Sequence, residues 1–316
     1  MSPGNVRLIG DIGGTNARLA IAMGGTYRHR HSYPTAEHDG LEAVIAAFLA
    51  ILPPELRPQE AAIAIAGPVG DDSIRMTNTG WGFTRTELAR QFGFARLIVL
   101  NDFAAIALAL PDLAAADTVQ IGGGSIRAGA PIALLGPGTG LGVGGLLHQA
   151  HGPLVVLAGE GGHATMPAAE PGDAAILAEI GASLGHVSAE RVLSGSGLVN
   201  LYQALCRRHN RPAPKLTPAE ITDESSGDPL CHEAVALFSA LLGTFAGNLA
   251  LTLGAEGGVH IAGSIVPRLG PRFARSEFRR RFEAKGRMQP YLARIPSFVI
   301  THPDPALIGL ARLPPP

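Results

Sequence analysis

The chain has few cysteines, few aromatic residues and few charges for its length. Its 316 residues include two cysteines, Cys206 and Cys231, which form no CxxC pair. They are too few for a disulfide scaffold or a four-cysteine zinc site, and we expect a reducing, cytoplasmic setting. Aromatic residues make up 5%, charged residues 16%, and the net charge is −1 at pH 7. Because nucleic-acid binders neutralise phosphates with basic residues, no nucleic-acid partner is expected.

Lysine is scarcer still. Lys215 and Lys285 are the two lysines among 25 basic residues, and neither stands in a glycine-rich segment. A P-loop needs the lysine of GxxxxGK[ST], and a protein-kinase fold needs a lysine on one strand. The sequence therefore excludes both of these nucleotide-binding folds.

One charge-free run, residues 234–255, has the length of a membrane span and contains the GxxxG of Gly243 and Gly247. Hydroxyl and amide side chains dilute it, and no lysine or arginine cluster flanks it. The first 14 residues lack the apolar core of a signal peptide. We therefore expect a soluble protein without a membrane partner, in which this run is a buried helix.

Apolar residues and glycine are abundant. Hydrophobic residues make up 46% of the chain, which is enough for a sizeable core, and the length suits two domains. The 41 glycines and 25 prolines show no Gly-X-Y period, so they indicate many tight turns and sites lined by backbone.

The plan of a strand, a glycine-rich turn and a second strand occurs twice, at residues 6–22 and 131–158. Apolar spacing and turn residues predict the remaining elements. Further strands are expected at 25–33, 61–66, 97–100, 258–262 and 297–301, and helices at 38–51, 103–110, 172–182, 188–208, 231–253 and 271–284. The stretch 112–130 is expected to be irregular. The pattern predicts two related α/β domains, a small one over 1–111, with 303–316 folding back onto it, and a large one over 112–302.

The first glycine turn lies in GDIGGTNAR, residues 10–18. Backbone N–H groups of Gly13 and Gly14 could approach phosphate oxygens closely, because glycine has no side chain and tolerates positive φ. Thr15 and Asn16 add side-chain donors, and Asp11 could hold Mg²⁺ through water. The alternative is an ordinary hairpin turn.

The second turn contains Gly138, Thr139 and Gly140 and offers the same phosphate chemistry. Its glycines also satisfy GxGxxG, and Glu160 follows Gly140 at the spacing of a dinucleotide fingerprint. That fingerprint requires the glycines to open a helix, whereas here they run into a segment with strand character. The phosphate-binding interpretation is therefore preferred to a dinucleotide-dependent oxidoreductase.

Polar side chains emerge from apolar surroundings at four further segments. They are Asn78, Asn101, Asp102, Glu160, His163 and Glu190. Together they could bind the vicinal hydroxyls of a sugar, and a carboxylate among them could take a hydroxyl proton. The alternatives are a helix N-cap for Asp102, a satisfied buried histidine for His163 and an exposed helix residue for Glu190.

These segments together resemble bacterial glucokinases of the hexokinase branch of the actin-like ATPase and sugar-kinase superfamily. The motifs, in chain order, are GDIGGTNARLA, AIAGPV, MTNTGW, LNDFAA, GPGTGLGVG, GEGGH, VSAERVLSGSGL, GNLAL, IAGSIVPR and FEAKGRM. The resemblance implies the two-domain actin-like ATPase (ribonuclease-H-like) fold, with mixed sheets flanked by helices and a ligand cleft between the domains. It also implies transfer of the γ-phosphoryl of Mg-ATP to the 6-hydroxyl of glucose. A homodimer is a further expectation.

The resemblance also implies a role for single residues. Asp102 would be the general base, and the other polar side chains named above would hold glucose. The two glycine turns would hold the ATP phosphates. Gly263 and Ser264 would line the adenosine pocket, where the family usually has two glycines. The alternatives are a kinase for another hexose, such as mannose, fructose or an amino sugar, and a non-catalytic sugar sensor.

Overall fold

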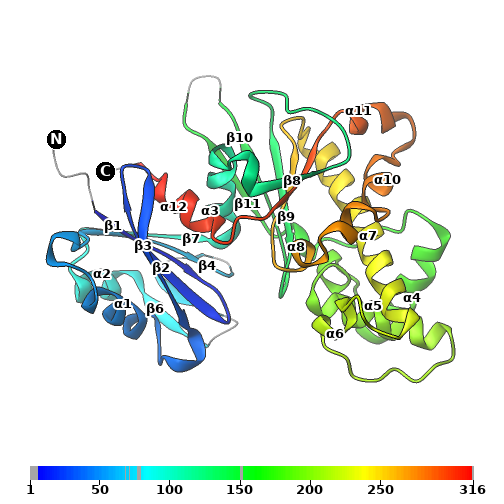
Figure 1. Ribbon diagram of the computed structural model, residues 1–316, viewed down its shortest axis with the longest axis horizontal. Coiled ribbons are helices and arrows are strands. Elements are labelled where there is room, and N and C mark those ends of the chain that lie inside the picture. Colours follow the sequence, from blue (N-terminus) through cyan, green and yellow to red (C-terminus); the bar gives the residue numbers. More distant parts are fainter. Residues whose placement is uncertain (1–5, 68, 71, 77–79, 150–151, 315–316) are drawn as a thin grey trace. The chain divides into compact units, whose positions relative to one another are not determined.

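The computed structural model describes residues 6–67, 69–70, 72–76, 80–149 and 152–314. It divides into two compact units (Figure 1). Unit 1 contains the chain up to Ala114 and from His302 onward, and unit 2 contains Ala115–Thr301. The C-terminal segment therefore belongs to the same unit as the first strands.

Unit 1 is a five-stranded sheet with helices on both faces. Its strands are β1 (Arg7–Ile12), β2 (Asn16–Met23), β3 (Thr26–Pro34), β4 (Glu60–Ile65) and β7 (Arg96–Asn101), with a separate hairpin of β5 (Ser73–Arg75) and β6 (Gly82–Thr84). Its helices are α1 (Leu41–Ala50), α2 (Arg85–Phe92), α3 (Asp102–Ala109) and α12 (Pro305–Ala311).

The sheet order is β3-β2-β1-β4-β7, antiparallel over the first three strands and parallel over β1, β4 and β7. One face packs on α1 and α2 through residues such as Leu8 and Phe48, and the other packs on α3 and α12 through Ile9 and Leu307 (Figure 1). Gly309 lets α12 approach α3, since a Cβ there would lie 1.8 Å from the Ala105 carbonyl oxygen. Because parallel strands end at one edge, this sheet brings the ends of β1 and β7 to the same side.

Unit 2 repeats this strand order with one additional edge strand. Its strands are β8 (Thr118–Ile121), β9 (Ile132–Pro137), β10 (Leu141–Leu147), β11 (Val155–Gly159), β12 (Val259–Ile261) and β13 (Ser297–Ile300), in the order β11-β10-β9-β12-β13-β8. Its helices are α4 (Pro171–Leu184), α5 (Gly195–Arg208), α6 (Pro218–Thr222), α7 (Pro229–Leu253), α8 (Ile265–Leu269), α9 (Pro271–Ala274), α10 (Phe278–Glu283) and α11 (Gln289–Ala293). As in unit 1, a three-stranded antiparallel meander is followed by parallel strands.

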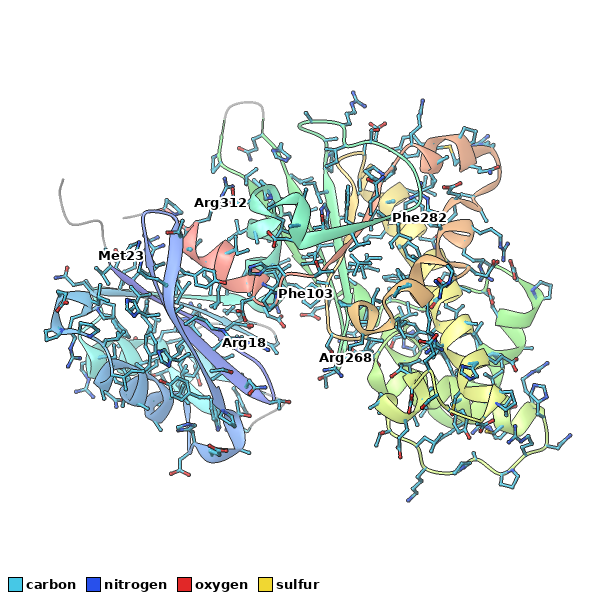
Figure 2. The ribbon with its side chains drawn as sticks, viewed as in Figure 1. Arg18, Met23, Phe103, Arg268, Phe282 and Arg312 are labelled. Atoms are coloured by element: carbon cyan, nitrogen blue, oxygen red, sulfur yellow. The ribbon has the colours of Figure 1, made fainter. Side chains whose placement is uncertain are left out.

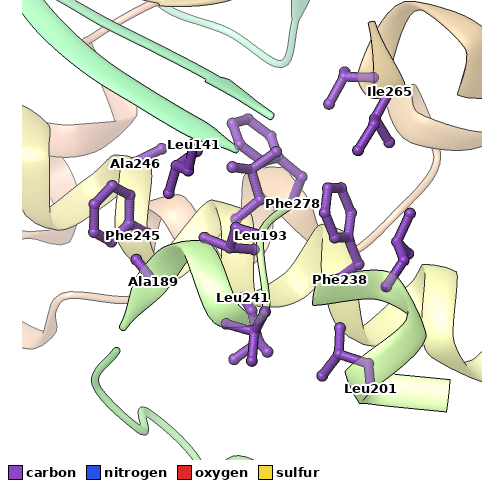
Figure 3. Close-up of a cluster of buried hydrophobic side chains, with 14 of the residues drawn as sticks. Leu141, Ala189, Leu193, Leu201, Phe238, Leu241, Phe245, Ala246, Ile265 and Phe278 are labelled. Atoms are coloured by element: carbon purple, nitrogen blue, oxygen red, sulfur yellow. The ribbon is translucent and has the colours of Figure 1, made fainter. Parts of the chain in front are cut away.

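The long apolar helix α7 is the one described helix with the length and composition of a membrane span, and 72% of its most apolar window is buried inside unit 2. Its GxxxG serves helix packing within that core. Side chains at Gly243 and Gly247 would lie 2.1 and 2.4 Å from the carbonyl oxygens of Phe278 and Phe282 on α10. Figure 3 shows Phe278 within the cluster of buried side chains around α7.

Two predicted helices are wrong in extent. The helix expected over 188–208 is divided into a 3-10 turn, η6 (Ala189–Arg191), and α5, because the Ser194 hydroxyl accepts the Gly197 N–H at 3.0 Å and starts α5 anew. The helix expected over 271–284 is likewise divided, into α9 and α10, and between them the Ser276 hydroxyl accepts the Phe278 N–H at 3.2 Å.

Other elements are not predicted by the patterns above. Helix α2 begins at the cap Thr84, which accepts the Glu87 N–H, and ends at Gly93 with φ of 70°. The stretch 112–130, expected to be irregular, contains β8, which pairs with β13 at the edge of the unit 2 sheet. Such an edge strand is partly exposed and shows no strong apolar signal.

Candidate active site

The first glycine turn joins the end of β1 to the start of β2 in the unit 1 sheet. The Gly13 N–H donates to the Asn16 carbonyl at 3.0 Å, and Thr35 holds the turn by donating its N–H to Thr15 O and its hydroxyl to Gly14 O, at 2.9 and 2.8 Å. Gly14 and Thr15 are exposed. The expectation that Gly13 and Gly14 need a positive φ is wrong, because neither adopts one. Their contribution to the turn is the absence of a side chain.

Asp11 is the last but one residue of β1 and stands directly opposite Arg18 of β2. Arg18 Nη1 donates to Asp11 Oδ2 at 3.0 Å, and the Asp11 side chain is 16% exposed. Burial raises the pKa of Asp11, and the Arg18 guanidinium opposes that rise. Arg18, on β2, is labelled in Figure 2. The pair places a carboxylate beside the first glycine turn.

Asn101 and Asp102 lie where β7 passes into α3. The N-cap is Asn101, whose Oδ1 accepts the N–H groups of Phe103 and Ala104 at 2.9 and 3.3 Å. The alternative that makes Asp102 the cap is therefore wrong, although Asp102 Oδ1 also accepts the Phe103 N–H at 2.9 Å. Asn101 Nδ2 donates to the Gly67 carbonyl at 3.0 Å, next to the end of β4. Most of the hydrogen-bonding capacity of Asn101 thus serves the local fold.

The second glycine turn joins β9 to β10 in unit 2. The Gly138 N–H donates to the Gly140 carbonyl at 2.8 Å, and the Gly195 N–H donates to the Gly138 carbonyl at 2.9 Å. The segment after the turn is strand β10, as expected, which excludes the helix that a dinucleotide fingerprint requires. Thr139 is exposed at the tip of the turn.

Glu190 is attached to this second turn. Its Oε2 accepts the Leu141 N–H at 2.9 Å, and a Cβ on Gly140 would lie 2.4 Å from the same oxygen. The residue is half-buried in η6. The interpretation of Glu190 as an exposed helix residue is therefore wrong. Glycine is needed at position 140 because a side chain there would collide with the Glu190 carboxylate.

Glu160 precedes a 3-10 turn, η5 (Gly161–His163), which packs on β10 and ends at His163. A Cβ on Gly162 would lie 2.1 Å from the Leu141 carbonyl oxygen, so this glycine allows the close packing. The side chains of Glu160 and His163 are 67% and 63% exposed, with Oε2 and Nε2 3.9 Å apart. His163 is therefore not a buried structural histidine. The Ala189 N–H donates to the Ala164 carbonyl at 2.8 Å, which joins η5 to η6.

Gly263 and Ser264 follow β12 and precede α8. Gly263 has φ of 85°, and a Cβ there would lie 2.2 Å from the Pro137 carbonyl oxygen, so it packs against the start of the second glycine turn. Ser264 is exposed and makes no cap hydrogen bond to α8. Asn78, the remaining predicted sugar ligand, lies outside the described residues.

Each unit therefore gathers its own predicted residues. Unit 1 brings Asp11, the turn 13–16 and Asn101–Asp102 to the same end of its parallel strands. In unit 2, Glu190 and the η5 turn, which Glu160 precedes and His163 ends, both contact Leu141 after the second glycine turn. Sequence reasoning missed Thr35, which holds the first turn from the end of β3. It also gave no role to Arg18, although Arg18 is part of the quoted motif.

The comparisons with known proteins agree over nearly the whole chain. A family model described as Glucokinase matches residues 8–314. The glucokinase of Nitrobacter hamburgensis is 47% identical over 311 residues, 98% of this chain and 97% of that protein. The crystal structure of a glucokinase from an Antarctic psychrotroph matches with a TM-score of 0.89 and 36% identity over 98% of each chain. That of Balamuthia mandrillaris glucokinase in complex with glucose matches at 0.77 and 22% identity over 98% of this chain and 93% of that one, a likeness of fold.

The actin-like ATPase fold class, with mixed sheets flanked by helices, is confirmed by these structures. The motif resemblance is also confirmed, because similarity extends far beyond the quoted segments. With the family model covering nearly all residues and a relative almost half identical throughout, the chain belongs to the glucokinase family.

Proposed function

We propose that this chain transfers the γ-phosphoryl of Mg-ATP to the 6-hydroxyl of glucose, giving glucose 6-phosphate and ADP. The observation that carries the proposal is the matched arrangement in the two units. Each has a hairpin glycine turn at a sheet edge with a carboxylate beside it, Asp11 in unit 1 and Glu190 in unit 2. Phosphoryl transfer depends mainly on positioning and on stabilising charge, which backbone-lined turns and polar side chains provide.

Glucose would be held by Asn101 and Asp102 from unit 1 and by Glu160, His163 and Glu190 from unit 2. The exposed side chains of Glu160 and His163 fit a role in binding a soluble ligand. Since Asn101 already caps α3, it would contribute its second amide N–H to a sugar oxygen. We also assign Asn78 to this set, on its motif alone.

Asp102 would act as the general base. Its carboxylate would accept the proton of the 6-hydroxyl while that oxygen forms a bond to the γ-phosphorus and the bond to the ADP oxygen breaks. The position at the start of α3 suits this role, because the Phe103 N–H bond and the buried helix beneath it fix the carboxyl group. A fixed base at the reacting oxygen contributes about 10²–10⁴-fold to the rate.

The triphosphate would be held by the backbone and hydroxyl groups of the two turns, Gly13–Asn16 and Gly138–Gly140. Gly263 packs against Pro137 at the start of the second turn. Gly263 and Ser264 would therefore contact the adenosine of an ATP molecule whose phosphates bind at that turn.

Mg²⁺ fits the residues at the first turn. Among the described residues no group of three or more His, Cys, Asp and Glu side chains could hold a metal by itself. Mg²⁺ commonly keeps several waters and binds one or two carboxylates together with substrate phosphates. Asp11 supplies such a carboxylate, with Oδ2 bound to Arg18 and Oδ1 left to accept from a metal-bound water. Bound there, Mg²⁺ would neutralise charge on the phosphate oxygens.

A coupled assay of glucose 6-phosphate formation tests the proposal. The purified chain should form product from glucose with Mg-ATP, and much less with ADP or polyphosphate as donor. Mannose, fructose and glucosamine should be poorer acceptors. Product from another hexose but not from glucose would reassign the substrate, and no product from any pairing would overturn the proposal. We place the enzyme in the cytoplasm, where the free, buried Cys206 and Cys231 would stay reduced.

A further inference from the structure

Four charged side chains alternate in sign along one face of the unit 1 sheet, in the order Asp11, Arg18, Asp304, Arg30. Arg18 Nη1 lies 3.0 Å from Asp11 Oδ2, and Arg18 Nε lies 3.3 Å from Asp304 Oδ1. Arg30 binds both oxygens of Asp304, with Nη2 at 3.0 Å and Nε at 3.1 Å. We call these four residues the charge row. It connects the start of the C-terminal helix to the carboxylate beside the first glycine turn.

The backbone of unit 1 is shaped to build the charge row. Asp11 and Arg18 stand opposite each other on the face that packs against α12, which also carries Ile9 and Ala20. Between β2 and β3 the register shifts, so that His29 and Arg30 together face Ala20. His29 has φ of 54°, an uncommon conformation for a residue other than glycine. This β-bulge places Arg30 on the α12 face, and bulges often redirect a side chain in this way.

Asp304 is the least exposed member of the charge row, with 7% of its side chain exposed. It occupies the N-cap position of α12, yet its carboxylate makes no cap hydrogen bond to that helix. Both of its oxygens instead bind arginine. Asp304 thus forms two ion pairs in place of a cap hydrogen bond. Because a buried charge requires an oppositely charged partner, these two arginines are needed to keep the Asp304 carboxylate buried.

We propose that Asp304 is a positioning residue for the Mg²⁺ that binds with the nucleotide phosphates, and that it acts through Arg18. Held by Asp304 at Nε and by Asp11 at Nη1, the Arg18 guanidinium is fixed in one plane and binds only Oδ2 of Asp11. Without Asp304, the guanidinium could rotate and bind both oxygens of Asp11, as arginine prefers with carboxylates. Oδ1 would then be lost to the metal-bound water. The inference rests on the proposed function.

Calorimetric titration with ADP, with and without Mg²⁺, tests the inference. The wild-type chain should bind Mg-ADP more tightly than ADP in EDTA. In Asp304→Asn, which keeps the shape and removes the charge, Mg-ADP binding should weaken about 10-fold, the usual effect of losing a partner behind a metal site. ADP binding in EDTA should not change, and the KM for glucose should stay within about 2-fold of wild type.

The control is Glu60→Gln. Glu60 forms a buried ion pair with Arg7 in the same sheet, and Arg7 donates to the Leu313 and Pro314 carbonyls, so this pair also fixes the C-terminal segment. It should lower the unfolding temperature without changing the Mg²⁺ dependence of ADP binding. If Asp304→Asn does not fold, Asp304→Glu replaces it and should weaken Mg-ADP binding by a smaller factor. Unchanged Mg-ADP binding in the folded Asp304 variant, or an equal weakening in Glu60→Gln, overturns the inference. A wild-type chain that binds no Mg-ADP instead overturns the proposed function.

Discussion

The Glu190 carboxylate accepts a hydrogen bond from the Leu141 backbone N–H, with 2.9 Å between Oε2 and the nitrogen. One side chain therefore belongs both to the proposed sugar ligands and to the support of the second glycine turn. Leu141 itself is buried in the core of unit 2 (Figure 3), so the bond is anchored to a rigid strand. The proposed sugar ligand Glu190 and the proposed phosphate-binding turn are thus joined by a hydrogen bond within unit 2.

Two substitutions should separate these roles of Glu190. In Glu190→Gln the amide oxygen can still accept the Leu141 N–H, but the charged acceptor toward the sugar is lost. The KM for glucose should rise at least about 10-fold, while the KM for ATP stays within about 2-fold. In Glu190→Ala both constants should rise, because the turn also loses its support. Steady-state kinetics with each substrate varied in turn will distinguish the two variants. If Glu190→Gln raises the KM for ATP as much as the KM for glucose, the two roles of Glu190 are not separate.

Gly140→Ala should disturb the same contact from the other side. The added Cβ would lie 2.4 Å from Glu190 Oε2, so either the carboxylate or the turn must move. A displacement of about 1 Å at such a position can lower activity by about 10²-fold, and we expect a fall in kcat/KM of that order for both substrates. The matched control is Gly172→Ala in α4, where a Cβ meets no atom within 4 Å. Equal activity of the two variants would show that Glu190 is not held against the turn.

Local signals in the sequence predict the local structure of those parts of the candidate site that are continuous in the chain. The two hairpin turns follow from glycine between apolar strands, and the change from β7 to α3 follows from Asn101-Asp102 before an apolar helix, although the sequence named Asp102 as the candidate cap and the structure uses Asn101. The division near Ser194 was missed because helical spacing continues on both sides of it, while the hydroxyl that stops the helix resembles an ordinary polar residue.

Contacts between distant segments could not be predicted in this way. Arg30 and Asp304 are 274 positions apart, and no local pattern relates them. The register shift that turns Arg30 toward Asp304 depends on the pairing of β2 with β3, which is a tertiary property. The bond from Glu190 to Leu141 likewise requires η6 to lie against β10. The sequence therefore predicts which groups are polar and available, and the fold decides which of them support one another.

His260 should make the stability of unit 2 sensitive to acid. It is 6% exposed on β12, its ring stacks on Phe298 with centroids 5.0 Å apart, and burial lowers its pKa to about 4 from 6.5. Because the unfolded chain takes up a proton near pH 6.5 and the folded chain does not until about pH 4, stability falls as the pH decreases through this window. Between pH 7 and pH 5 the free energy of unfolding should fall by about 2 kcal/mol because of His260.

His260→Phe should remove that contribution, since phenylalanine can keep the stacking and has no titrating group. Urea unfolding followed by circular dichroism at pH 7 and pH 5 measures the difference between variant and wild type. His148→Gln changes an exposed histidine and should leave the pH dependence of wild type intact. If wild type and His260→Phe lose equal stability on acidification, His260 is protonated in the folded chain and the argument is wrong.

Asp102→Asn tests the proposed base directly. The amide keeps an oxygen for the Phe103 N–H, so the start of α3 should remain intact, but it cannot accept a proton from the sugar. Turnover should fall at least about 10²-fold, while the dissociation constant for glucose, measured by the fluorescence of Trp81 or by calorimetry, should change no more than a few-fold. Asp112→Asn, at an exposed acid in the same unit, should keep wild-type turnover. A variant at Asp102 that turns over nearly as fast as wild type would exclude this carboxylate as the base, whereas equal losses of turnover and binding would make it a sugar ligand only.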